Sequence, residues 1–195
     1  MKKIGFDLDD VLLNLSDPLR EFLNIKYTRS VKREDLKDFY IESIYGIERE
    51  IFKKDIADFY LHNDHINSSP INGAVEVVEQ LSKKYILEIV TAKPDSLAEI
   101  TEQWLLKHFP NMFKVVHFAN HHHDNHKKRL KSEICLVENI SVFIDDSLDN
   151  AKDLSSSNIP VLLFDAPWNQ SESLPGLVKR VHSWNEIEKE IENLL

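Results

Sequence analysis

The sequence contains very little cysteine and no long hydrophobic run. Among its 195 residues there is one cysteine, Cys135. A single thiol excludes an internal disulfide framework and is typical of a reducing compartment. No apolar stretch approaches the roughly 20 residues that a membrane-spanning helix needs. Met1-Lys2-Lys3 resembles the start of a signal peptide, but the apolar run after it is short and Asp7 interrupts it. We therefore expect a cytoplasmic protein.

The sequence also lacks an excess of positive charge. Its formal net charge is -9 with the histidines counted as neutral. This balance repels a polyanionic backbone, so we do not expect broad nucleic-acid binding. A small phosphorylated ligand is compatible with it, because a metal ion and a few local cations decide the field at a site. The oligomeric state stays open, a homodimer included.

The distribution of apolar residues predicts an α/β fold. Short apolar runs near the N-terminus and at 85–90, 115–118, 142–144 and 161–164 are typical of buried strands. Helical patterns separate them from residue 70 onward. Alternating strands and helices indicate a Rossmann-like parallel sheet with flanking helices and right-handed crossovers.

Several helix starts are predicted from capping residues. Asn72 precedes a helical pattern, and Ser96-Leu97-Ala98-Glu99 has the form of a capping box. A further helix is expected from Ser147. The C-terminal helix is expected to begin within Ser183-Trp184-Asn185-Glu186.

Residues 15–69 interrupt the alternation of strands and helices. Their apolar residues recur at helical spacing, as in Leu19, Phe22 and Leu23. We interpret this segment as a small helical cap domain inserted after the first strand. Residues 1–14 and 70–195 then form the α/β core domain.

Carboxylates gather where two predicted strands end. Asp7, Asp9 and Asp10 close the first strand, and Asp145-Asp146 closes the strand at 142–144. Side chains alternate along an extended segment, so Asp7 and Asp9 point to the same side. Like charges this close call for a cation between them, and Mg2+ prefers oxygen ligands. The carboxyl ends of parallel strands are also where α/β sheets bind ligands.

Four features in this order resemble a known family. Asp7-x-Asp9-x-Val11, a strand ending at Thr91, the later Lys131 and the pair Asp145-Asp146 resemble the four motifs of the haloacid dehalogenase superfamily. The resemblance covers the whole predicted core. Its first and fourth motifs are specific in combination, whereas an isolated Thr or Lys means little.

The resemblance implies a mechanism for the carboxylates. Asp7 is expected to attack phosphorus and form an aspartyl-phosphate. Asp9 is expected to protonate the leaving alkoxide and then to activate water. Mg2+ is expected to be held by Asp7, the backbone carbonyl of Asp9 and Asp145, and Asp146 is expected to help position the metal.

The resemblance also implies phosphate-binding groups. Thr91 and Ala92 are expected to contact the phosphoryl group, and Lys131 is expected to pair with the nucleophile and the phosphate. Lys131 belongs to a basic cluster, so Lys127 and Lys128 stay open as alternatives. A solvated basic turn is the competing interpretation of the cluster.

The acid at Asp9 favours a phosphatase. Dehalogenases of the superfamily lack this acid, and its ion-pumping members carry Lys-Thr at the corresponding place. Residues 91–94 and 144–147, together with the early cap, are most similar to the 5'(3')-deoxyribonucleotidase family. This resemblance implies a Mg2+-dependent phosphatase that acts on nucleoside monophosphates.

Aromatic residues of the predicted cap offer a wall for a base or a deoxyribose. We expect Phe39 and Tyr40 to contact substrate, while Phe52, Phe59 and Tyr60 are further candidates. Packing inside the cap is the competing interpretation for each of them, because aromatic side chains are usually buried.

The roles of two features of the sequence stay open. His121-His122-His123 and His126 are interpreted as a polar loop in preference to a metal site, because no cysteine lies nearby. Asp10 stands where related motifs often carry Gly, and Asp tolerates the backbone angles that such a turn requires.

Three other functions compete with a nucleotidase as interpretations of the sequence. A phosphatase for a sugar phosphate or another metabolite stays open, since aromatics alone do not identify a ring. A non-catalytic phosphate-binding protein would not need an acid at Asp9. A phosphoacceptor receiver domain is disfavoured, because Ala119-Asn120 follows the strand where its acceptor aspartate is expected.

Overall fold

The computed structural model describes residues 1–38, 40–61, 68–120, 129–170 and 173–195. Within these residues the strands form one six-stranded sheet in the order β3-β2-β1-β4-β5-β6. All neighbouring strands are parallel, as predicted. The strands are β1 (Lys3–Phe6), β2 (Ile86–Thr91), β3 (Val115–Phe118), β4 (Ile140–Asp145), β5 (Val161–Phe164) and β6 (Val178–Val181). This order puts the switch point of the sheet between β1 and β4, where open α/β sheets bind ligands.

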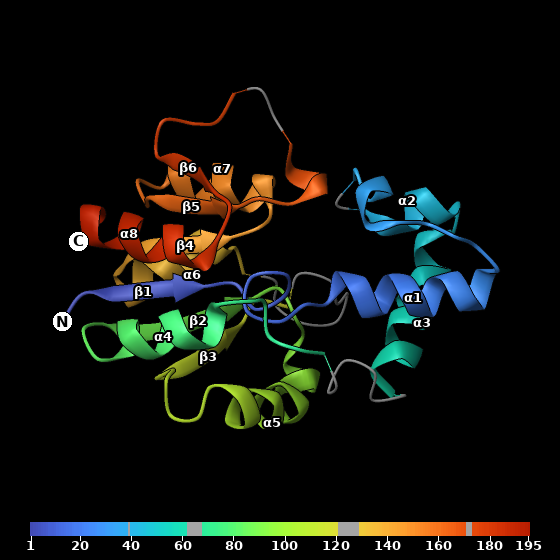
Figure 1. Cartoon of the computed structure of the whole chain (residues 1–195), viewed down its shortest axis with the longest axis horizontal. Helices are drawn as coiled ribbons and strands as arrows, with labels where there is room; N and C mark the ends of the chain where they lie inside the picture. The colour runs from blue at the N-terminus through green and yellow to red at the C-terminus, as the bar shows by residue number, and fades with distance from the viewer. Residues whose placement is uncertain (39, 62–67, 121–128, 171–172) are drawn as a thin grey trace.

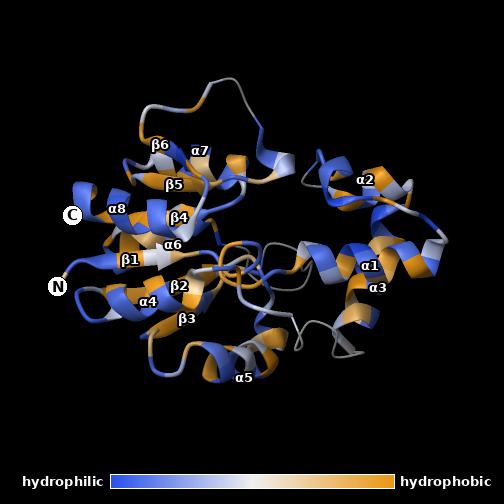
Figure 2. Ribbon diagram, viewed as in Figure 1, coloured by the Kyte–Doolittle hydropathy of each residue, from blue (hydrophilic) through white to orange (hydrophobic). Residues whose placement is uncertain are grey.

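Helices cover both faces of the sheet (Figure 1). The helices are α1 (Ser16–Tyr27), α2 (Ile41–Tyr45), α3 (Arg49–Leu61), α4 (Ala74–Ser82), α5 (Ala98–His108), α6 (Lys131–Glu138), α7 (Leu148–Ser156) and α8 (Trp184–Leu194), with 3-10 turns η1 (Arg33–Asp35), η2 (Asp95–Leu97) and η3 (Pro167–Asn169). One apolar core joins α4, α5 and α8 to the sheet. A second core joins α6 and α7 to its other face. Figure 2 shows the mixed apolar and polar faces of these helices.

The alternation of side chains along β1 explains its single glycine. Ile4 and Phe6 are fully buried in the first core. Gly5 points to the opposite face, where a Cβ atom would lie 2.4 Å from Cδ2 of Phe143. Only glycine allows Phe143 to pack this closely. Continuing the alternation puts Asp7 on the face that α6 covers.

Helices α1 to α3 form a separate layer beyond the carboxyl end of the sheet (Figure 1). They have an apolar cluster of their own, centred on the buried residues Leu19, Leu23, Tyr45 and Phe59. The chain leaves the sheet after β1 to build this layer and returns to it at α4. The division into domains at residues 14/15 and 69/70 stays a prediction.

Two predicted helix starts are wrong. No side-chain cap forms at the start of α4, whose capping position is Gly73 with φ 82°, so Asn72 does not have the predicted role. Ser96 lies inside η2, and α5 starts at Ala98, one residue later than a cap at Ser96 predicts and without a side-chain cap. In both places the turn that leads into the helix determines the backbone, and it takes precedence over the local capping pattern.

The other helix starts are confirmed. Ser183 accepts a hydrogen bond from the backbone N–H of Glu186 at 3.2 Å, which caps α8. Ser147 likewise caps α7. The strand β6 was not predicted, because its four residues carry only two apolar side chains, Val178 and Val181.

Candidate active site

The segment after β1 is a tight turn that holds its carboxylates at the end of the sheet. The N–H of Asp7 donates to the carbonyl of Ile144 in β4 at 2.8 Å. The N–H of Leu13 then returns to the carbonyl of Leu8 at 2.9 Å. Asp10 has a φ of 53°, so this turn uses the left-handed conformation that the residue type was expected to tolerate.

Asp10 stabilises the start of α1. Its Oδ1 accepts a hydrogen bond from the backbone N–H of Ser16 at 3.1 Å. The residue at the capping position, Leu15, has no side chain that can do this. Burial raises the pKa of Asp10 to about 6, although the Ser16 contact opposes the shift. The third carboxylate of the motif therefore has a structural role that joins β1 to the first helix of the outer layer.

Lys131 lies between the carboxylates of β1 and β4. Its Nζ is 2.7 Å from Oδ2 of Asp7 and 2.8 Å from Oδ2 of Asp145. The side chain is fully buried and its ammonium group lies 5.4 Å from the ring centroid of Phe143. Burial lowers the pKa of Lys131, but Asp145 and Asp7 outweigh burial and raise it above its usual range. The lysine at the first position of α6 is thus a permanent cation of the site.

Both oxygens of Asp7 have defined partners. Oδ1 accepts a hydrogen bond from the N–H of Leu8 at 2.7 Å, and Oδ2 contacts Lys131. The pKa of Asp7 is raised to about 7, chiefly by burial and also by the charges of Asp145 and Asp9, while Lys131 opposes the shift. The carboxylate is held in one orientation in a region of high negative charge.

The donor set of this cluster fits a hard divalent cation. Carboxylate oxygens of Asp7, Asp145 and Asp146 all lie within 4.8 Å of one another, and all three residues are buried. Burial raises the pKa of Asp146 well above its ordinary value, and the charges of Asp145 and Asp7 add to this. The single positive charge of Lys131 does not balance the negative charge of three buried carboxylates. A divalent cation, which binds oxygen ligands, would balance it.

The orientation of Asp145 is set by the start of α7. Its Oδ1 accepts a hydrogen bond from the N–H of Ser147 at 2.8 Å. The side-chain amide of Asn150, one turn into the helix, lies 3.3 Å from both carboxylate oxygens. The last residue of β4 is therefore fixed before any ligand binds.

Asp9 has a different partner from Asp7. Its Oδ1 forms a short ion pair with Nζ of Lys93, which follows β2 and is itself buried. Asp9 raises the pKa of Lys93 against the effect of burial, and the lysine lies 5.6 Å from the ring centroid of Tyr60 in α3. No role in the site was predicted for Lys93 from the sequence. Its place two residues after Thr91, at the carboxyl end of a central strand, was the available signal.

Thr91 and Ala92 lie at the same edge of the sheet. Thr91 is the last residue of β2 and is fully buried. Its Oγ accepts a hydrogen bond from the N–H of Lys93 at 3.2 Å, and its carbonyl accepts one from Ala119 at 2.8 Å. These bonds hold the loop at 91–93 next to the carboxylates through Lys93 and Asp9.

The aromatic residues of the outer layer divide between packing and the site. Phe59 is fully buried in the cluster of α1 to α3, and Phe52 packs against that cluster, as the packing interpretation predicts. Tyr60 packs there too but also faces Lys93, and burial raises its pKa to about 12. Tyr40 is half exposed and lines a pocket.

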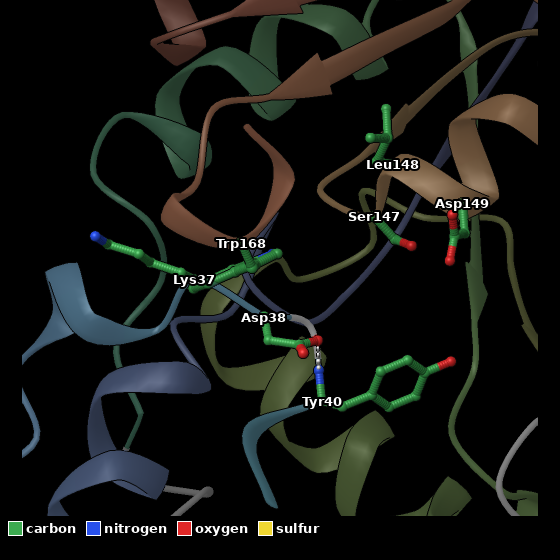
Figure 3. Close-up of a pocket in the computed structure, with 7 residues that line it drawn as sticks. All are labelled: Lys37, Asp38, Tyr40, Ser147, Leu148, Asp149 and Trp168. Atoms are coloured by element: carbon green, nitrogen blue, oxygen red, sulfur yellow. Dashed lines mark hydrogen bonds between the residues drawn. The ribbon is translucent and has the colours of Figure 1, made fainter. Parts of the chain in front are cut away.

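That pocket lies between the outer layer and the sheet domain (Figure 3). It is lined by Lys37, Asp38 and Tyr40 from one side and by Ser147, Leu148, Asp149 and Trp168 from the other. Its volume is about 170 Å³. Trp168 donates a hydrogen bond from Nε1 to Oδ2 of Asp146 at 2.8 Å, so the pocket adjoins the carboxylate cluster.

A second group of potential metal ligands lies on the sheet, and it is an ion-pair network. Glu88, His117 and Glu138 place ligand atoms within 4.8 Å of one another. Lys3 occupies this group, with its Nζ 2.8 Å from Glu88 and 3.0 Å from Glu138. The lysine supplies the positive charge that the two carboxylates need.

Some predicted residues lie outside the described part of the chain. They are Phe39, Lys127, Lys128 and the histidines from His121 to His126. Among the described residues of the basic cluster, Lys131 is buried in the carboxylate group and Arg129 is exposed.

The fold is that of haloacid dehalogenase-like hydrolases. A haloacid dehalogenase-like hydrolase from Streptococcus pneumoniae is similar in structure, with a TM-score of 0.72 and 15% sequence identity over 98% of each chain. At that identity the likeness concerns the fold. No helix among the described residues is both long and apolar enough to cross a membrane.

The family model for the 5' nucleotidase, deoxy (pyrimidine), cytosolic type C proteins matches residues 1–194, and the chain belongs to this family. A 5'(3')-deoxyribonucleotidase of Bacillus subtilis is 29% identical over 98% of this chain and 99% of its own. A nucleotidase of Clostridium acetobutylicum is 23% identical over 86% of this chain and 82% of its own. The protein is a nucleotidase of the haloacid dehalogenase superfamily that hydrolyses small phosphomonoesters.

Proposed function

We propose that this nucleotidase is a Mg2+-dependent 5'(3')-deoxyribonucleotidase that works through an aspartyl-phosphate on Asp7. One observation carries the mechanism. Asp7 and Asp9 lie two residues apart but pair with different lysines, Lys131 and Lys93. Two carboxylates in separate environments suit two separate tasks.

In the first step, Asp7 attacks phosphorus. A bond forms between a carboxylate oxygen of Asp7 and the phosphorus atom as the ester P–O bond breaks. Asp9, protonated in the substrate complex, donates its proton to the leaving alkoxide, which departs as the nucleoside. Leu8 N–H and Lys131 hold the carboxylate of Asp7 in a fixed orientation beforehand.

In the second step, water releases the phosphate. Asp9, now a carboxylate, takes a proton from a water molecule as the water oxygen attacks phosphorus. The bond between phosphorus and Asp7 breaks, which regenerates the free carboxylate and yields inorganic phosphate. Lys131, Lys93 and the Thr91 hydroxyl would stabilise the phosphoryl oxygens in both steps.

Asp7, Asp145 and Asp146 would hold Mg2+. When bound, the ion would screen the attacking carboxylate from the phosphate and balance charge in the transition state. Asp9 would add its backbone carbonyl to this set. Its side chain contacts Lys93 and so lies outside this set of side-chain ligands.

The stabilising effect of Mg2+ should increase with pH. A carboxyl group whose pKa is raised by folding binds more protons in the folded state than in the unfolded state. Its contribution to the free energy of unfolding therefore decreases as the pH rises. For Asp7 this range runs from 3.8 to about 7. Protonated carboxyls do not bind Mg2+, so the gain in melting temperature on replacing EDTA with Mg2+ should be small near about pH 5 and several degrees near about pH 8.

Differential scanning fluorimetry at both pH values measures this effect. Asp146→Asn is the matched variant, because it removes one ligand and one buried charge. Its gain on Mg2+ addition should be smaller than that of the wild type at the higher pH. A gain of equal size at both pH values would contradict a metal site built from these carboxylates.

Lys93→Met should weaken substrate binding. The substitution keeps the length of the buried side chain and removes a cation beside the proposed phosphate site. A charge-assisted hydrogen bond contributes about 1.5–3 kcal/mol, so we expect kcat/KM to fall roughly 10- to 100-fold. Steady-state kinetics of phosphate release measures it, with exposed Lys152→Met as the control. Unchanged kinetics would remove Lys93 from the site.

The substrate class rests on the family and on the pocket. The matching family model is described as a deoxy (pyrimidine) 5' nucleotidase, and one relative is named a 5'(3')-deoxyribonucleotidase. The half-exposed ring of Tyr40 lines a pocket that adjoins Asp146 through Trp168. A planar base or a deoxyribose can stack in such a place.

A Mg2+-dependent phosphate-release screen tests the proposal. It compares deoxyribo- and ribonucleoside 5'- and 3'-monophosphates with sugar phosphates, each with and without EDTA. We expect deoxyribonucleoside monophosphates to be hydrolysed with the highest kcat/KM and only with Mg2+. A preference for ribonucleotides or sugar phosphates would overturn the substrate class, and turnover in EDTA would overturn the metal.

A further inference from the structure

Trp168 joins the carboxylate cluster to the outer layer of helices. Its indole N–H donates to Oδ2 of Asp146 at 2.8 Å. Its ring meets Arg33 of η1, whose Cζ lies 5.5 Å from the ring centroid. One half-buried side chain in η3 therefore contacts both a proposed metal ligand and the segment inserted after β1.

The η3 turn holds Asp146 at two points. Besides the Trp168 bond to the side chain, Nδ2 of Asn169 donates to the backbone carbonyl of Asp146 at 2.8 Å. Asn169 is held in turn by Arg180 of β6, which donates to its backbone carbonyl at 2.8 Å. Because an indole N–H can only donate, its bond holds Oδ2 of Asp146 and does not engage Oδ1.

Arg33 is fixed by the start of α1. Its Nη1 lies 2.8 Å from Oγ of Ser16 and 3.2 Å from Oδ2 of Asp17. Ser16 also donates its N–H to Asp10, in the turn that carries Asp7 and Asp9. Contacts within the outer layer therefore orient the guanidinium group that packs on the indole ring.

We propose that Trp168 is a positioning residue that orients Asp146 for Mg2+ and is itself held in place by Arg33. The docking of η1 on η3 would then increase the affinity of the metal site, and by linkage Mg2+ would strengthen the docking. This inference rests on the proposed Mg2+-dependent function. It concerns the metal site, and because Trp168 also lines the pocket proposed for the substrate, the tests measure Mg2+ binding.

Isothermal titration with Mg2+ tests the two contacts separately. Trp168→Phe keeps a ring for Arg33 but removes the N–H donor to Asp146. Loss of such a partner of a metal ligand typically lowers affinity about 10- to 100-fold, and we expect a loss in this range. Arg33→Gln removes the cation–π contact and should weaken Mg2+ binding about two- to fivefold.

The double variant tests the link between the two contacts. If Arg33 acts through Trp168, Arg33→Gln should change Mg2+ affinity in the wild-type background and have no further effect beside Trp168→Phe. Equal effects in both backgrounds would overturn the link. Unchanged Mg2+ affinity in Trp168→Phe would overturn the positioning role.

A spectroscopic measurement identifies the role as positioning. Mg2+ should change the indole fluorescence of the wild type, and this change should be absent in Trp168→Phe. A Mg2+-dependent fluorescence change of wild-type size in Trp168→Phe would overturn the positioning role.

Trp104→Phe is the matched control. Trp104 is buried and donates its indole N–H to the carbonyl of Ser68 at 2.8 Å, away from the carboxylates. This variant should bind Mg2+ with wild-type affinity, and an equal loss in it would overturn the assignment of the effect to Trp168. Wild-type protein that binds no Mg2+ would overturn the proposed function as well, whereas wild-type binding with unaffected variants would overturn this inference alone.

Discussion

Replacing Asp7 with asparagine should abolish phosphate release and leave the fold intact. An amide is not a nucleophile toward phosphorus under these conditions, and it cannot form the aspartyl-phosphate. Loss of a nucleophile that acts together with an acid/base typically costs kcat roughly ten-thousandfold or more. Phosphate release from a nucleoside monophosphate at saturating Mg2+ measures the loss.

The folded state should tolerate this change because Asp7 lies among like charges. Burial and the neighbouring Asp145 raise its pKa to about 7, so the ionised form is unfavourable there. Asparagine has the same shape and its oxygen still accepts the hydrogen bond from Leu8. Lys131 keeps its contact with Asp145. We expect the free energy of unfolding without metal to change by less than about 2 kcal/mol.

Two variants in the same turn control the experiment. Asp9→Asn should lose about 100- to 10,000-fold in kcat, because it removes only the proton donor and acceptor. Asp10→Asn should retain most of the activity, since an amide oxygen can still accept the bond from Ser16. Substantial turnover by Asp7→Asn would exclude Asp7 as the nucleophile, and equal losses in all three variants would point to damage of the turn.

Replacing Lys131 with methionine should reduce both activity and stability. The lysine is fully buried between Asp7 and Asp145, and removal of one partner from a buried ion pair costs about 3–5 kcal/mol. The same change removes the cation that would contact the nucleophile and the phosphate. We expect phosphate release to fall at least about a hundredfold at saturating Mg2+.

The loss of stability should depend on pH. Without Lys131 the site loses the cation that contacts Asp7 and Asp145, so the pKa of Asp7 should rise further. At low pH Asp7 is protonated and the loss should shrink, whereas near about pH 8 it should be largest. Urea unfolding at two pH values measures this difference.

Lys152→Met is the control for this variant. Lys152 lies on α7 with more than half of its side chain exposed, and its contact with Asp149 is 3.6 Å long. Such a pair contributes little, so the variant should differ from the wild type by less than about 1 kcal/mol. A Lys131→Met protein with wild-type stability and activity would contradict the central place of this lysine.

The parallel sheet and the location of the site could be predicted from the sequence alone. The strands β3 and β5 match their predicted bounds, β2 and β4 differ by one or two residues at each end, and β6 was not predicted. Apolar runs that end in Asp7, Thr91 and Asp145 predict where ligands bind, because the carboxyl ends of neighbouring parallel strands meet at one edge. The period of two along β1 likewise predicts that Asp7 and Asp9 lie on one side.

Local patterns failed where a tertiary contact determined the backbone. Asn72 and Ser96 have the residue types of helix caps, but the turns that lead into α4 and α5 start each helix later. The strand β6 has too few apolar residues to be predicted and is held by its pairing with β5. The packing interpretation of Phe59 was also resolved only by its burial, whereas contact of Tyr40 with substrate stays a prediction.

The sequence by itself determined which carboxylates close the strands of the sheet, because the ends of the apolar runs and the alternation of side chains follow from its pattern. The tertiary structure decided their partners. It placed Lys131 between Asp7 and Asp145, Lys93 on Asp9, and Trp168 on Asp146. These cations and donors come from distant segments, and only the packing of α6, the β2 loop and η3 against one sheet edge brings them within reach of the carboxylates.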